Sequence, residues 1–145
     1  MSETSSRDWP RRLLIGFYWF LAAEFVLGAM TKFAPGETVF GPAYSVKFAD
    51  WGYPSWFRFV IGGVELICAI LLVVPRRRAR FLGAGALVVV LVGAVVTHVA
   101  NQDPIYESVS APLHLAIMAA IAWASRPAHW RELRPVRRVP LSDQG

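Results

Sequence analysis

Two glutamates, Glu24 and Glu65, lie within long apolar stretches of this sequence. An ionised side chain inside hydrocarbon costs a few kcal/mol or more, so a carboxylate placed there is a functional candidate by default. Each has a basic neighbour along the chain: Lys32 follows Glu24 by eight residues, and Arg58 precedes Glu65 by seven. Because buried ions must be paired or neutralised, we predict that these four side chains point inward and form a polar cluster.

Two histidines extend this set, since His98 ends the third apolar stretch and His114 begins the fourth. An imidazole that exchanges protons near neutral pH could act as a ligand or a proton relay. Helical rise places both at a similar depth near the outer surface, above the two glutamates. Three other interpretations stay open: cations that reach the headgroups, glutamates that only join two helices, and structural histidines.

The elements that position these residues are four apolar stretches. Three are close to the roughly 20 residues that cross a bilayer, and the fourth is shorter, at the low edge of the usual range. They predict an all-α integral membrane protein, an up-and-down bundle of four helices formed by one domain, 13–125. We expect the first helix to remain uncleaved, because its apolar run is longer than that of a signal peptide. The predicted transmembrane helices cover 13–33, 56–74, 79–100 and 111–125, between an N-terminal tail, 1–12, and a basic tail, 126–145.

Positive charge predicts the orientation, because Lys and Arg are enriched on the cytoplasmic side. Twelve of the 15 basic residues fall in the two tails and in the loop between the second and third stretches. Both termini are therefore expected in the cytoplasm. The net charge of +5 does not indicate nucleic-acid binding, because no soluble face is left to carry it. The twelve are Arg7, Arg11, Arg12, Arg76, Arg77, Arg78, Arg80, Arg126, Arg131, Arg134, Arg137 and Arg138.

Small residues predict where the helices approach one another, because they let backbones come close within lipid. The first outer loop, 34–55, is compatible with a short surface helix or with an irregular cap over the bundle. The single cysteine, Cys68, permits no intrachain disulfide, and we predict no metal site. The small residues are Gly83, Gly85, Gly93 and Thr97 in the third stretch, and Ala116, Ala120 and Ala124 in the fourth.

Two local motifs resemble those of the DoxX family of small four-helix membrane proteins. One is Gly28-Ala29-Met30-Thr31-Lys32-Phe33, followed by a proline-rich loop; the other is Gly62-Gly63-Val64-Glu65-Leu66. An arginine-rich hairpin and a histidine at the end of the third stretch follow in the same order. The similarity covers roughly residues 14–124 and implies a multi-pass protein of the bacterial inner (plasma) membrane.

The resemblance also implies redox work, since relatives are linked to electron transfer to quinone, to membrane oxidoreductase assemblies and to maturation of periplasmic proteins. Thiol exchange within this chain is disfavoured, because Cys68 has no partner cysteine. We therefore expect a membrane subunit or partner of a redox system, with an outward-facing polar site that contacts a quinone. The alternatives are a non-enzymatic scaffold for an oxidoreductase partner, and, less favoured, a small transporter or a haem held by His98 and His114. The expected partners are membrane lipid, an oxidoreductase and further copies of the chain.

Overall fold

The computed structural model describes residues 8–38 and 41–127. This part of the chain is helical apart from one isolated bridge between Thr38 and Gly41, which confirms the all-α prediction. The termini on which Arg7, Arg131, Arg134, Arg137 and Arg138 fall lie outside the described residues. The helices are α1 Trp9–Phe33, α2 Tyr44–Asp50, α3 Phe57–Val73, α4 Arg77–Ala100, α5 Ile105–Ser108 and α6 Ser110–Ser125.

Within the described residues, three helical segments are long and apolar enough to cross a membrane, namely Trp9–Phe33, Arg77–Ala100 and Ile105–Ser125. The third joins α5 and α6 end to end. Helix α3 is also strongly apolar but has only 17 residues, which corresponds to about 25 Å. The long apolar helices, with most of their large hydrophobic side chains exposed, are typical of a protein surrounded by lipid.

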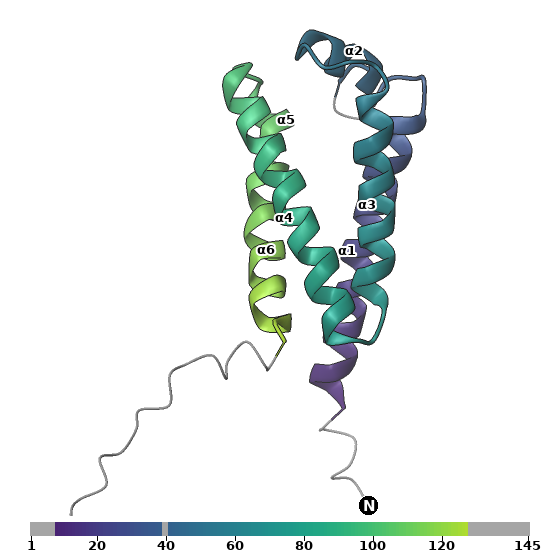
Figure 1. Cartoon of the computed structure of the whole chain (residues 1–145), viewed down its shortest axis with the longest axis vertical. Coiled ribbons are helices and arrows are strands. Elements are labelled where there is room, and N and C mark those ends of the chain that lie inside the picture. Colours follow the sequence, from purple (N-terminus) through teal and green to yellow (C-terminus); the bar gives the residue numbers. More distant parts are fainter. Residues whose placement is uncertain (1–7, 39–40, 128–145) are drawn as a thin grey trace, which may run out of the picture.

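The four long helices form two pairs, α1 with α3 and α4 with α6, which are joined by packing of α3 against α4. The pairs lie close together at the lower end in Figure 1 and diverge towards the upper end. The start of α1 and the end of α6 lie at the lower end, while α2 and α5 lie at the upper end. The largest fully buried side chains of the apolar core come one from each long helix: Leu21, Leu72, Leu87 and Met118.

Helix α1 begins at Trp9, so its first turn includes part of the predicted tail. Pro10 lies in that turn, where the missing N–H of proline costs no helical hydrogen bond. The loop between α1 and α3 contains the seven-residue helix α2, so of the two alternatives that the sequence left open, the short helix is present. Lys47 and Phe48 of α2 are buried, so this helix also covers the upper end of α1 and α3.

Only part of the predicted small-residue contacts is present. A Cβ atom on Gly83 would lie 2.8 Å from Cβ of Leu71 and 3.1 Å from the carbonyl oxygen of Cys68, so α4 approaches α3 closely there. Gly85 and Gly93 have nothing within 4 Å of such an atom. The prediction for α6 is wrong, because its three predicted contact residues, Ala116, Ala120 and Ala124, are exposed. The buried residues of this helix are Ala111, Met118, Ile121 and Ser125.

Candidate functional site

The most buried charged contact joins α1 to α3 near the upper end of the bundle. Nζ of Lys32 lies 2.8 Å from Oε2 of Glu65, and both side chains are only 9% exposed. Side chains of a helix tilt towards its N-terminus, so Lys32 extends back along α1 towards the middle of the bundle instead of up to the headgroups. The ammonium also donates to the carbonyl of Gly28 at 3.2 Å and lies 4.6 Å from the ring centre of Tyr44.

Arg58 was predicted to belong to the same cluster, but it caps the C-terminal end of α1 instead. Its guanidinium donates to the carbonyl oxygens of Lys32 at 2.6 Å and of Ala34 at 3.4 Å. The last carbonyls of a helix have no partner within that helix. Arg58 therefore satisfies backbone groups that would otherwise be costly to leave unpaired near lipid.

The second acidic residue, Glu24 on α1, contacts a residue of α6, which belongs to the other helix pair. Its Oε2 lies 3.2 Å from Nε2 of His114, so a side chain of α1 meets one of α6 although the two backbones do not pack together. Glu24 is 39% exposed and His114 20% exposed. The ring of Phe25 meets the imidazole edge-on, with ring centres 5.6 Å apart.

The hydrogen bonds of His114 show how this pair holds a proton. Nδ1 lies 2.8 Å from the carbonyl oxygen of Ser110, and since a carbonyl only accepts, Nδ1 carries a hydrogen. Nε2 then attracts the carboxyl group of Glu24 only if one further proton is shared between them. That proton lies either on Nε2, facing a carboxylate, or on Glu24, facing a neutral imidazole. Both forms have zero net charge, which lowers the cost of placing the pair beside hydrocarbon.

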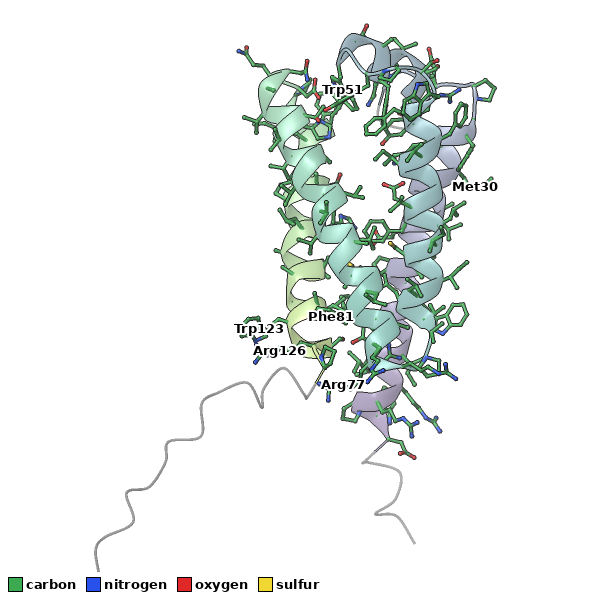
Figure 2. The ribbon with its side chains drawn as sticks, viewed as in Figure 1. Met30, Trp51, Arg77, Phe81, Trp123 and Arg126 are labelled. Carbon is green, nitrogen blue, oxygen red and sulfur yellow. The ribbon has the colours of Figure 1, made fainter. Side chains whose placement is uncertain are left out.

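A third group of polar contacts closes the upper end of the bundle. Nζ of Lys47 on α2 lies 2.7 Å from Oε2 of Glu107 on α5. The residue after α2, Trp51, donates from its indole nitrogen to Asp103, 3.1 Å away, and Nδ1 of His98 lies 2.7 Å from the same carboxylate oxygen. Figure 2 shows Trp51 at this end, between α2 and the end of α4. These contacts join the loop between α1 and α3 to the loop between α4 and α6.

The structure separates the six predicted residues within the part of the chain that it describes. Lys32 and Glu65 form an ion pair, and Glu24 and His114 form a second pair. Arg58 caps the end of α1, and His98 belongs to the contacts at the upper end of the bundle. The two histidines do not share a depth: His98 contacts the loop after α4, whereas His114 reaches Glu24, about 14 Å below the end of α1. The matched depth on which the sequence based a haem between them is therefore not found in the structure, and haem binding itself stays an untested prediction.

Sequence reasoning did not find a recurring use of arginine at helix ends. Besides Arg58 on α1, Arg80 donates to the carbonyl of Leu72 at 3.2 Å near the end of α3, and Arg77 donates to that of Ala124 at 2.9 Å near the end of α6. Figure 2 shows Arg77 at the lower end with Arg126 and Trp123. The arginines that indicate orientation therefore also terminate neighbouring helices. The signal available in the sequence was that Arg58, Arg77 and Arg80 each lie within a few residues of an end of an apolar stretch.

Comparison with known protein families gives a match. The model of the DoxX-like family matches residues 17–125. This chain belongs to the DoxX-like family. The match includes both glutamates, Lys32, Arg58 and both histidines. Neither a curated protein nor a solved structure matches the chain significantly. In this DoxX-like protein, no group of three or more His, Cys, Asp or Glu among residues 8–38 and 41–127 could hold a metal ion.

Proposed function

We propose that this DoxX-like membrane protein crosses the inner membrane four times, with both termini in the cytoplasm. Helix α3 supplies the fourth crossing, since 17 residues reach the lower limit of a transmembrane helix. Figure 2 shows Arg77 and Arg126 at the lower end of the bundle, where α1 and α4 begin and α6 ends. More Lys and Arg residues lie at that end than at the other, which supports this orientation. The basic residues of the lower end are Arg11, Arg12, Arg76, Arg77, Arg78, Arg80 and Arg126, and those of the upper end are Lys32, Lys47 and Arg58.

Thiol labelling in intact cells tests the orientation. A cysteine in place of Gly36, in the first outer loop, is expected to react with a membrane-impermeant maleimide, while a cysteine in place of Arg78 reacts only after lysis. The unaltered protein is the control, because its Cys68 is buried and gives little background. Labelling of Arg78→Cys in intact cells, with protection of Gly36→Cys, would reverse the proposed topology.

We further propose that the Glu24–His114 pair binds the head group of a quinone for a redox system. The observation that carries this is the partial exposure of a proton-sharing pair about 14 Å below the end of α1, where the surrounding phase is lipid. A quinone is dissolved in that phase and can approach from the side. Its carbonyl oxygens accept hydrogen bonds, and its reduction takes up two electrons and two protons.

The residues present fit one part of that chemistry. The pair holds one proton, through which it can donate a hydrogen bond to an oxygen of the neutral quinone, so the bound complex carries no net charge. Phe25 provides an aromatic edge beside it. Electrons would come from a partner oxidoreductase, which this chain would serve as a membrane subunit. The buried Lys32–Glu65 pair is placed to hold α1 against α3 and is not used as a proton donor in this scheme.

Quinone binding can be measured by titrating a short-chain benzoquinone into the purified protein in mild detergent, followed by tryptophan fluorescence. Glu24→Gln and His114→Leu each remove the shared proton, so affinity is expected to fall at least about tenfold. Glu37→Gln, which removes an exposed charge from the outer loop, is the matched control and is expected to bind as the unaltered protein does. Equal affinity in all four proteins would reject the quinone site.

A scaffold function for an oxidoreductase partner is favoured by one observation. The exposed alanines of α6, spaced by four residues, form a smooth stripe of the kind at which transmembrane helices associate. Activity of the partner enzyme in cells separates the two functions. Loss with Ala120→Ile but not with Glu24→Gln supports a scaffold, and loss with Glu24→Gln but not with Ala120→Ile supports the quinone site.

A further inference from the structure

The lower end of the bundle contains a recess of about 270 Å³ between the first turns of α1 and the hairpin that joins α3 to α4. Its lining combines two guanidinium groups and a phenol with an aliphatic wall. The volume is just under the roughly 300–1,000 Å³ of sites that enclose whole small ligands, so it suits part of a larger molecule. The lining residues are Arg11, Leu14, Ile15, Tyr18, Val73, Pro75 and Arg80.

Arg80 is held in place before any ligand arrives. Its Nε donates to the carbonyl of Leu72, and its guanidinium stacks on Tyr18 with 4.3 Å between the guanidinium carbon and the ring centre. The two terminal nitrogens make no hydrogen bond to the described residues, so they remain available as donors. Arg11 is exposed and has no side-chain hydrogen bond within the same part of the chain.

We propose that this recess binds the phosphodiester of an anionic phospholipid. A guanidinium matches the geometry of phosphate oxygens and can bind two of them at once. Leu14, Ile15 and Val73 continue the recess as an apolar wall, which suits the start of an acyl chain and not a free anion. The site lies where the arginine-rich end of the bundle meets lipid, and basic pockets at that level are the kind that hold lipid head groups.

The recess is independent of the pair proposed to bind quinone. Those of its residues that lie on α1, from Arg11 to Tyr18, are at the opposite end of this helix from Lys32 and roughly two to four turns below Glu24. Occupancy by a lipid would join α1 to the α3–α4 hairpin, because Arg11 comes from the first element and Arg80 from the second.

Native mass spectrometry of the full-length protein in detergent tests the proposal. Phosphatidylglycerol is expected to remain bound at lower concentration than phosphatidylcholine. Arg80→Gln and Arg11→Gln are each expected to reduce the bound fraction at limiting lipid about fivefold, the effect of one lost arginine at a membrane surface. If Arg80→Gln does not fold, Arg11→Gln carries the test, because the side chain of Arg11 makes no hydrogen bond to the described residues.

Two matched controls remove one positive charge from the same end of the bundle without touching the recess. Arg12→Gln and Arg78→Gln are expected to bind phosphatidylglycerol within about twofold of the unaltered protein, since neither side chain lines the site. An equal reduction in all four variants would overturn the proposal, as would equal binding of the two lipids. Displacement of phosphatidylglycerol by inorganic phosphate at the same concentration would assign the site to a free anion and also overturn it.

Discussion

Replacing Lys32 by methionine is expected to lower the free energy of unfolding by about 3–5 kcal/mol, as breaking a buried ion pair does in other proteins. The substitution leaves Glu65 with no opposing charge, about 12 Å from the start of α3, where its short side chain cannot reach water. Glu65 must then take up a proton or remain buried as an uncompensated ion. Unfolding of the purified protein by a titration with sodium dodecyl sulfate, followed by circular dichroism, measures the loss.

Two further variants show whether the loss comes from the pair. Glu65→Leu is expected to cost less than Lys32→Met, because the freed lysine lies in the last turn of α1 and can turn towards the outer surface. The double variant is expected to recover most of the stability, since an apolar pair of similar volume replaces a buried ion pair at little cost. A double variant as unstable as the sum of the single variants would contradict this account.

Placing leucine at Gly83 is expected to destabilise the protein by about 3 kcal/mol, the upper part of the range for an overpacked core. The first added carbon would lie 2.8 Å from Cβ of Leu71 and 3.1 Å from the carbonyl oxygen of Cys68. Relief requires α4 to move away from α3, and this is the packing that joins the two helix pairs. The same detergent titration measures the effect.

Gly85→Leu is the matched control for that substitution. It lies two residues further along the same helix, where an added Cβ meets nothing within 4 Å. Leucine is more favourable than glycine inside a helix by a little less than ~1 kcal/mol. This variant is therefore expected to be as stable as the unaltered protein or slightly more stable. If the two variants lose equal stability, the close approach at Gly83 is not what joins the pairs.

The sequence by itself determined the helical class, the family and the residues that carry charge inside the apolar segments. The physical reason is that a chain surrounded by lipid must satisfy its backbone within helices, so long apolar stretches specify the elements directly. The same constraint made Glu24 and Glu65 conspicuous, because every buried ion needs a partner. Both glutamates do have partners in the structure.

Only the tertiary structure decided which partner each glutamate has. Helical spacing places residues on a face and at a depth, but it does not say which helices are adjacent or how far apart they lie. Because α1 packs on α3 and diverges from α6, Glu65 is sealed against Lys32, whereas Glu24 reaches across to His114 and stays partly exposed. The rotation of α6 likewise turned its alanines outward, since the larger Met118 and Ile121 fill the space beside α4. A single sequence does not specify that rotation when every face of the helix is apolar.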